Sequence, residues 1–176
     1  KMVKIEEITI PSAHLGKLNP LADLFYAQYR TEPIADNDGN VPTMLPYLMQ
    51  DGYDRAEDPT VYRAAVVEND HIRAEFIPAL GGRLRSLYDK DKGRELLYKN
   101  PVFRPGNLAL RNAWFSGGVE FNLGIRGHTP MTCSPMHVTI DKSTDGDILR
   151  LYEYERIRGV MYSVSAWVSE DSPVLY

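Results

Sequence analysis

The chain has 176 residues, of which 43% are hydrophobic and 25% are charged, and this composition predicts a folded globular core. The formal net charge of −4 and the alternation of acids and bases over residues 89–95 argue against a nucleic acid or an anionic membrane surface as partner. No apolar run approaches the roughly 20 residues of a membrane-spanning helix. The single cysteine, Cys133, cannot form an internal disulfide. These features predict a cytoplasmic protein that does not bind membranes.

The first 44 residues are predicted to form a strand, a short helix and a connection. Residues 3–10 alternate between apolar and charged side chains, as a strand does. Asn19 and Pro20 precede apolar residues at helical spacing, which predicts a cap, a proline at the first helical position and a short helix. Turn-forming residues then dominate residues 31–46. The predicted organisation is this N-terminal segment, 1–44, followed by a β domain, 45–176.

Short alternating segments separated by turn residues dominate the chain beyond residue 61. Such a pattern predicts antiparallel hairpins in which one face of each strand is buried. Many strands with few helices predict an all-β fold, an antiparallel β-sandwich. The predicted strand pairs are 61–67 with 72–76, 83–88 with 95–98, and 136–140 with 148–155, followed by a last alternating strand over 160–168.

The final residues, 172–176, resemble the start of another strand because an apolar triplet is followed by nothing polar. We therefore expect the chain to be the front part of a larger sandwich. An incomplete sheet has an unpaired edge, and such an edge favours pairing with another copy of the same chain. The sequence thus predicts a homo-oligomer formed through that edge.

The stretch from Arg111 to His128 carries the candidate site. It combines two arginines, a tryptophan, a carboxylate, an amide and a histidine with glycines at 117, 118, 124 and 127. An aromatic plane covers the apolar face of a pyranose, and polar groups around it bind the hydroxyls, so this combination suits a sugar pocket. Trp114 is expected to face the cleft and Phe115 the core. The predicted substrate-binding residues are Arg111, Trp114 and Asn122, and the predicted catalytic residues are Glu120 and His128.

Each of these residues also has an ordinary structural interpretation. Glu120 can form a salt bridge to Arg111 or Arg126 that holds the loop, or it can have a functional role. His128 follows a glycine, and a loop imidazole there can titrate near neutrality. No pair of histidines has metal-ligand spacing with a third partner, so the sequence predicts neither a metal nor a cofactor. Cys133 has no neighbouring base and is expected to be a buried, inert thiol.

Four segments stand out in the chain: residues 45–55, 80–89, 93–102 and 107–135. They resemble an uncharacterised bacterial domain family of the galactose-mutarotase-like group, usually encoded ahead of tetratricopeptide repeats. The resemblance implies a large antiparallel β-supersandwich, of which this chain would be the N-terminal part, and a concave face that binds carbohydrate. In aldose epimerases a histidine is the general acid and a late glutamate the base; that glutamate would lie beyond Tyr176.

The resemblance leaves three hypotheses about function open. The first is a carbohydrate-active domain that processes a sugar at its anomeric centre by general acid/base chemistry, as an epimerase or a glycoside hydrolase does. The second is a non-catalytic carbohydrate-binding or scaffold module attached to tetratricopeptide repeats. The third is that the polar stretch is only structural. Fold alone does not choose among them.

Overall fold

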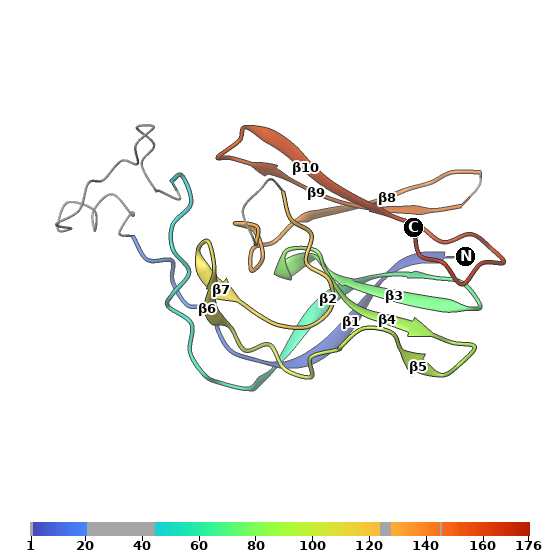
Figure 1. Ribbon diagram of the computed structural model, residues 1–176, viewed down its shortest axis with the longest axis horizontal. Coiled ribbons are helices and arrows are strands. Elements are labelled where there is room, and N and C mark those ends of the chain that lie inside the picture. Colours follow the sequence, from blue (N-terminus) through green and yellow to red (C-terminus); the bar gives the residue numbers. More distant parts are fainter. Residues whose placement is uncertain (1, 21–44, 124–127, 145) are drawn as a thin grey trace.

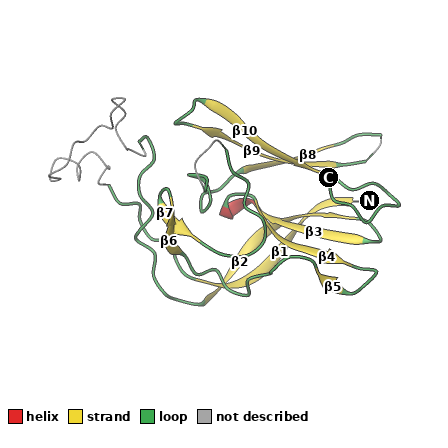
Figure 2. Cartoon of the chain, in the orientation of Figure 1, coloured by secondary structure: helices red, strands yellow, loops and turns green. Residues whose placement is uncertain are grey.

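The computed structural model describes residues 2–20, 45–123, 128–144 and 146–176. This part of the chain is all-β, and its single helical element is a short 3-10 helix (Figures 1 and 2). The helix expected after Pro20 lies outside the described residues. The elements are β1 (Met2–Ser12), β2 (Asp58–Glu68), β3 (Ile72–Ile77), η1 (Pro78–Leu80), β4 (Arg83–Asp89), β5 (Arg94–Glu95), β6 (Gly106–Ala109), β7 (Asn112–Trp114), β8 (His137–Asp141), β9 (Ile148–Glu155) and β10 (Val160–Ala166).

The strands form three sheets in which every paired strand runs antiparallel to its neighbour. The largest sheet has the order β1-β2-β3-β4-β5, the second has the order β10-β9-β8, and β6 and β7 form a two-stranded ribbon. In Figure 1 the second sheet lies above the first, and the β6–β7 ribbon lies at one end of both. The predicted all-β, antiparallel class is therefore confirmed.

One hydrophobic core joins the two larger sheets. Phe76 on β3 and Leu149, Leu151 and Tyr162 on the second sheet are all buried in it. Inward-facing residues alternate with polar ones along these strands, so each sheet hides one face from water. At about 25 cal/mol for each Å² of apolar surface, this burial is the main force that holds the sheets together.

The hairpins predicted from alternation are present. Asn69 closes the β2–β3 hairpin, because its side-chain oxygen accepts hydrogen bonds from the backbone N–H groups of His71 and Ile72, each at 2.9 Å. β8 pairs with β9, and β9 with β10, at the predicted positions. The predicted strand at 95–98 is shorter, since only Arg94–Glu95 pairs with β4.

Two pairings were not predicted from the sequence. β1 pairs with β2 along its whole length, from Met2 opposite Glu68 to Ser12 opposite Asp58. β6 pairs with β7 around a turn that contains Arg111. The N-terminal strand therefore belongs to the same sheet as the strands of the β domain.

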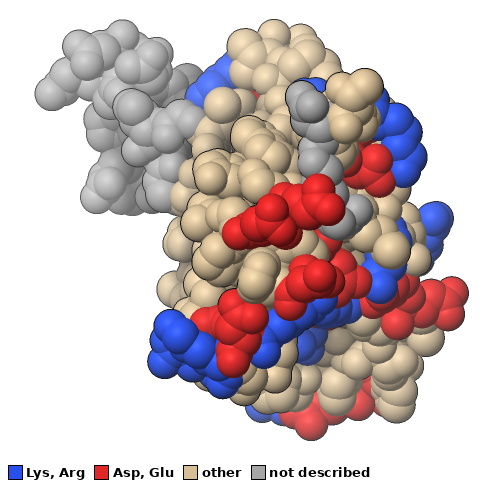
Figure 3. All heavy atoms as spheres, turned by 90° about the vertical axis from the view of Figure 1, so that its right-hand side faces the viewer, with Lys and Arg blue, Asp and Glu red and all other residues tan. Residues whose placement is uncertain are grey.

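The outer face of the large sheet carries acids and bases in alternation. Figure 3 shows Asp and Glu interleaved with Lys and Arg on the side of the molecule near the chain termini. Lys4 bridges Glu6 and Glu68, each at 2.6 Å, and the carboxylate of Glu75 contacts Arg73 at 3.1 Å and Arg85 at 2.7 Å. Charges on this face are balanced locally by neighbours of opposite sign.

Candidate functional site

The β6–β7 ribbon presents two of the predicted site residues. Arg111 lies in the tight turn between the strands, and Asn112 after it has φ 75°, a left-handed conformation that asparagine tolerates better than most residues. Trp114 is the last residue of β7 and is half-buried, while Phe115 is buried and packs edge-on against Phe103 at 5.0 Å. Phe115 therefore faces the core, as predicted.

Gly118 places the carboxylate of Glu120. Gly118 has φ 65°, and a Cβ atom on it would lie 2.1 Å from the carbonyl oxygen of Leu84, so no other residue fits there. This close approach allows Val119 and Leu84 to exchange backbone hydrogen bonds of 2.9 and 3.2 Å. Gly118 therefore serves close contact between two backbones. Val119 forms this single β-bridge, and residues 120–123 form no strand.

Glu120 is the centre of a cluster of hydrogen-bond donors, which we call the Glu120 cluster. Its Oε2 accepts hydrogen bonds from Trp114 Nε1 at 2.8 Å and from His128 Nδ1 at 2.9 Å, if that nitrogen carries the proton. Its Oε1 accepts one from the backbone N–H of Thr129 at 3.0 Å. Arg83 Nη2 lies 3.8 Å from Oε2. The predicted salt bridge to Arg111 does not form, and Arg126 lies outside the described residues.

These donors hold Glu120 in its ionised form. Burial of the carboxyl raises its pKa. The hydrogen bonds from His128, Thr129 and Trp114 and the charge of Arg83 together lower the pKa by more than burial raises it, so the pKa of Glu120 lies below its ordinary value of 4.5. A carboxylate that stays ionised at neutral pH cannot serve as a general acid. It can orient an imidazole or accept hydrogen bonds.

His128 sits at the edge of the Glu120 cluster in a strained backbone conformation. Its φ is 65°, and its side chain is 35% exposed. The imidazole ring lies 5.3 Å from the Trp114 ring, and Glu120 holds Nδ1, which directs the other ring nitrogen away from the carboxylate. A carboxylate that orients one nitrogen of a histidine is the arrangement that prepares the other nitrogen for proton transfer.

The loop over residues 129–134 links this cluster to Arg111. Besides the bond from Thr129 to Glu120, Arg83 donates to the Thr132 hydroxyl at 3.0 Å. Arg111 Nη1 donates to the Pro130 carbonyl at 3.2 Å and to the Ser134 hydroxyl at 2.8 Å. Three charged side chains therefore hold one loop. Cys133 lies buried within it, and burial raises the pKa of its thiol to about 12, as expected for an inert thiol.

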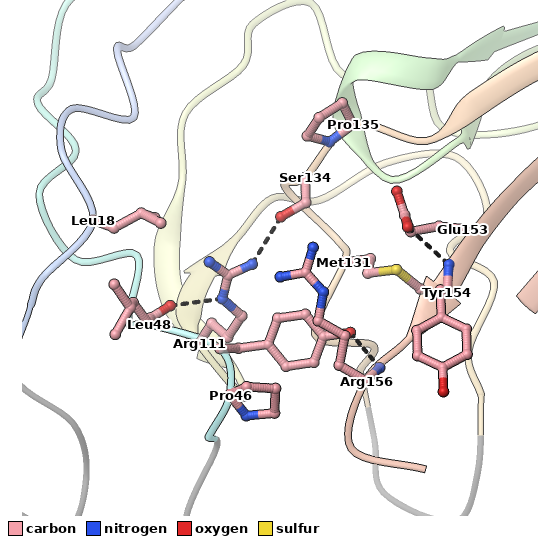
Figure 4. Close-up of a pocket in the computed structure, with 11 residues that line it drawn as sticks. Leu18, Pro46, Leu48, Arg111, Met131, Ser134, Pro135, Glu153, Tyr154 and Arg156 are labelled. Carbon is pink, nitrogen blue, oxygen red and sulfur yellow. Dashed lines mark hydrogen bonds between the residues drawn. The ribbon is translucent and has the colours of Figure 1, made fainter. Parts of the chain in front are cut away.

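A pocket of about 320 Å³ opens beside Arg111, between the 129–134 loop and β9 (Figure 4). Arg111 is 6% exposed and its Nε donates to the Leu48 carbonyl at 2.7 Å. The pocket is lined by Leu18, Pro46, Tyr47, Leu48, Arg111, Met131, Ser134, Pro135, Glu153, Tyr154 and Arg156. We call it the arginine pocket.

Tyr47 is the aromatic centre of the arginine pocket. The guanidinium carbons of Arg111 and Arg156 lie 5.3 and 5.7 Å from the centroid of its ring. Its hydroxyl accepts a hydrogen bond from the backbone N–H of Arg156 at 2.9 Å, and burial raises its pKa, which keeps the phenol neutral. Tyr154 also lines the pocket, and its side chain is exposed. The ring of Tyr154 is therefore accessible to a ligand.

The five predicted site residues do not form one site. Trp114, Glu120 and His128 meet in the Glu120 cluster, whereas Arg111 lies beyond the 129–134 loop in the arginine pocket. Asn122 is exposed and takes no part in the contacts of either group. Sequence reasoning missed Tyr47, Tyr154 and Arg156 as pocket residues. For Tyr154, only the pairing of β9 with β10 reveals which side of the strand its side chain occupies.

Over residues 2–20, 45–123, 128–144 and 146–176, no group of three or more histidine, cysteine, aspartate or glutamate side chains is placed to hold a metal ion. In the same part of the chain, no helix has the length and apolar character needed to cross a membrane.

The fold and the two polar regions define an all-β domain with a pocket between loops and a sheet. Residues 39–175 match the protein family described as "Domain of unknown function (DUF5107)", and the chain belongs to this family. A similar solved structure is that of a TPR-domain containing protein from Parabacteroides distasonis, with a TM-score of 0.76 and 24% sequence identity. The similarity covers 99% of this chain but only 28% of that one.

These comparisons support one part of the predicted resemblance, the uncharacterised family, and leave the other part untested. They show the uncharacterised β-rich family, and the similar solved protein is itself described as containing a TPR domain. At 24% identity, the structural likeness shows the fold alone. The galactose-mutarotase-like affiliation stays a prediction.

Proposed function

We propose that this domain binds a carbohydrate in the arginine pocket. The observation that carries the proposal is the combination of an exposed tyrosine ring with guanidinium, hydroxyl and carboxylate groups around one opening of about 320 Å³. That volume lies within the range of about 300–1,000 Å³ that is typical of small-molecule sites. A pyranose offers an apolar face for the ring and hydroxyls for the polar groups.

The groups that line the pocket divide these roles. Tyr154 is the proposed stacking surface, because its side chain is exposed at the opening. Arg111 and Ser134 come from the two loops that meet there and are already joined at 2.8 Å, so their positions are set before a ligand arrives. A site that is already formed avoids the entropic cost of ordering its side chains on binding.

Binding without turnover fits the geometry better than acid catalysis by Glu120. All of the contacts around that carboxylate stabilise its charged form, and its pKa is lowered. Trp114 donates its indole N–H to the same carboxylate, so its ring has a structural contact within the cluster. The domain would then supply sugar recognition beside the tetratricopeptide repeats that accompany related chains.

The test of binding compares Tyr154→Ala with Tyr98→Ala. Tyr98 is a matched control because its side chain is 69% exposed and does not line the pocket. A glycan screen of the wild-type protein identifies a ligand, and calorimetry then measures its affinity for each variant. We expect Tyr154→Ala to weaken binding at least tenfold, since one stacked ring contributes about 1.4 kcal/mol or more, and Tyr98→Ala to leave it unchanged. Equal affinities in all three proteins would disprove the proposed stacking surface.

A second candidate function is favoured by the contact between Glu120 and His128. The 2.9 Å hydrogen bond, the strained φ of His128 and the neighbouring Trp114 ring together suit a histidine that transfers a proton at a sugar's anomeric centre. His128→Asn is the test, because asparagine tolerates positive φ. If His128 is catalytic, polarimetry with an aldose shows mutarotation that falls about 100-fold or more in the variant. No turnover by the wild-type protein would leave the binding function.

We also propose that the described sheets are the N-terminal part of a galactose-mutarotase-like supersandwich. The support is the antiparallel arrangement and the position of β10 at the edge of its sheet among the described residues. An edge strand of this kind favours association with a second copy, and analytical ultracentrifugation over a range of concentrations measures it. A monomer at all concentrations would count against the predicted homo-oligomer.

A further inference from the structure

Two positive charges share the arginine pocket. Arg111 and Arg156 both contact the ring of Tyr47, at 5.3 and 5.7 Å from its centroid. Arg111 is buried, which lowers its pKa, and the nearby charge of Arg156 acts in the same direction. Guanidinium groups remain charged in proteins, so the two side chains repel one another.

The acids near the pocket already have other partners. Glu153 lines the pocket, but its Oε1 accepts the backbone N–H of Tyr154 at 2.8 Å and its Oε2 lies 3.8 Å from His137. Glu155 is fully buried and accepts the backbone N–H groups of Ile157 and Arg158 at 3.0 and 2.8 Å. Within the part of the chain that the structure describes, neither Arg111 nor Arg156 forms a salt bridge with a carboxylate.

Arginines on the outer face of the large sheet, in contrast, have carboxylate partners. Arg73 and Arg85 both contact Glu75, at 3.1 and 2.7 Å, and Arg73 also contacts Glu6 at 2.6 Å. There each cation has a carboxylate at hydrogen-bonding distance. Among the residues that the structure describes, the pair in the pocket lacks this counter-charge, although Arg111 is more deeply buried than Arg73 or Arg85.

The donors of the two pocket arginines are only partly used. Arg111 commits Nε to Leu48 and Nη1 to Pro130 and Ser134, which fixes its guanidinium in place. Among the described residues, Nη2 of Arg111 and the guanidinium of Arg156 have no hydrogen-bond acceptor. Figure 4 shows both guanidinium groups in the middle of the lining residues.

We propose that the sugar bound in the arginine pocket carries an anionic group, a carboxylate or a phosphate, which lies between Arg111 and Arg156. This inference rests on the proposed carbohydrate function and names the class of sugar. An anion there would relieve the repulsion between the two cations and accept charge-assisted hydrogen bonds from donors that are otherwise unused. Guanidinium groups recognise carboxylates and phosphates by paired, parallel hydrogen bonds, and this geometry makes arginine more selective than lysine for such groups.

The experiment compares neutral and anionic forms of one sugar. Calorimetry at fixed ionic strength measures glucose, glucuronate, glucose 6-phosphate and inorganic sulfate against the wild-type chain, Arg156→Gln and Arg94→Gln. Arg156 is the residue to change because it is exposed, whereas Arg111 also holds the 129–134 loop. Arg94 is exposed on β5 and does not line the pocket, so Arg94→Gln removes the same charge at a position outside the proposed site.

We expect glucuronate or glucose 6-phosphate to bind at least tenfold more tightly than glucose. Arg156→Gln should remove this preference, so that it binds glucose and the anionic sugars with similar affinity, and Arg94→Gln should behave as the wild type. Glucuronate and glucose 6-phosphate distinguish a carboxylate from a phosphate as the preferred group.

Three outcomes contradict the inference, and they can be told apart. Equal affinity for glucose and both anionic sugars would remove the anionic class and leave carbohydrate binding intact. Sulfate binding as tight as that of the anionic sugars would mean that the pocket recognises an anion and no sugar. No binding of any of the four compounds to the wild-type chain would overturn this inference, and a negative glycan screen would then remove the proposed function with it.

Discussion

The Glu120 cluster and the arginine pocket lie at opposite ends of one loop and differ in their balance of charge. In the cluster a partly buried anion is surrounded by donors from Trp114, His128 and Thr129 and by the charge of Arg83. In the pocket two cations share a tyrosine ring and lack an acid partner among the described residues. A balanced buried charge indicates a structural anchor, whereas an unbalanced one indicates a place for a ligand of opposite charge.

The difference also explains how one loop serves both regions. Residues 129–134 are fixed by Glu120 and Arg83 on one side and by Arg111 on the other. Gly81 packs against the loop, and its N–H donates to the Ser134 carbonyl at 2.8 Å. A Cβ atom at this position would lie 2.6 Å from the Met131 carbonyl oxygen, so the close contact requires glycine. Anchoring at Glu120 therefore holds the wall of the pocket in place.

The largest expected effect is that of Glu120→Ala on stability. The substitution leaves the buried Arg83 without its acid and leaves donors of Trp114 and Thr129 unpaired, and breaking a buried charge pair costs about 3–5 kcal/mol. Urea unfolding measures the loss. Glu57→Ala is the control, because Glu57 and its partner Arg104 are each 48% exposed, and an exposed pair contributes less than about 1 kcal/mol.

Labelling of Cys133 with a thiol reagent is a second measurement of the effect of Glu120→Ala. Its thiol is buried in the 129–134 loop with a pKa raised to about 12, so a thiol reagent should modify the native wild-type protein very slowly. If Glu120 anchors the loop, Glu120→Ala should speed labelling in the absence of denaturant. Unchanged stability together with unchanged labelling would mean that Glu120 is no anchor, and would favour its predicted role in a site.

Acid should weaken the cluster and leave the arginine pair charged. The pKa of Glu120 is lower in the folded chain than its ordinary value of 4.5, so its contribution to stability is fully present above that value and is lost as the pH falls through the folded pKa. Glu75 and Glu155 also have lowered pKa values, so they too contribute to the loss of stability of the wild-type protein as the pH falls.

Glu120→Gln isolates the share of Glu120 in this loss. The amide cannot ionise, so the difference in unfolding free energy between the wild type and Glu120→Gln should be largest at pH 7 and shrink below pH 4.5. Urea unfolding at pH 7, 5, 4 and 3.5 measures this difference. A constant difference across this range would show that the charge of Glu120 does not stabilise the fold.

Arg156→Gln should have a small effect on stability and in the opposite direction. Removing one of two like charges relieves repulsion, while the backbone hydrogen bond from residue 156 to Tyr47 remains. We expect the free energy of unfolding to stay the same or to rise by up to about 0.5 kcal/mol, as is usual for exposed positions. Thermal unfolding without ligand measures it. A clear loss of stability would indicate that Arg156 has a structural role and that the pocket is balanced by another group.

Much of the fold was predictable because alternation over a hairpin is a local signal. The β2–β3 and β8–β9 pairs follow directly from the spacing of apolar residues and turn formers. The β1–β2 pair joins residues separated by more than 45 positions, and alternation along one strand does not reveal its neighbour. The β6–β7 ribbon was missed because its strands are too short for a period to appear.

The site was predictable only where sequence neighbours are also neighbours in space. Trp114, Glu120 and His128 lie within 15 residues of one another, and both Trp114 and His128 contact Glu120. The arginine pocket combines Tyr47, Arg111 and Arg156, which lie on three separate segments. No spacing in the chain indicates that grouping, since it depends on how the 129–134 loop packs against β9.

The smallest expected effect is that of Asn122→Ala, and it tests which of the two regions binds sugar. The sequence places Asn122 on one face with Glu120, as alternate residues of a strand would be, but residues 120–123 form no strand and Asn122 is exposed. An exposed amide outside both groups should change stability by less than about 0.5 kcal/mol and leave the affinity for the identified sugar unchanged. Calorimetry beside Tyr154→Ala compares the two regions directly. If Asn122→Ala weakens binding and Tyr154→Ala does not, the sugar lies over the Glu120 cluster, and the unbalanced arginines serve some other anion.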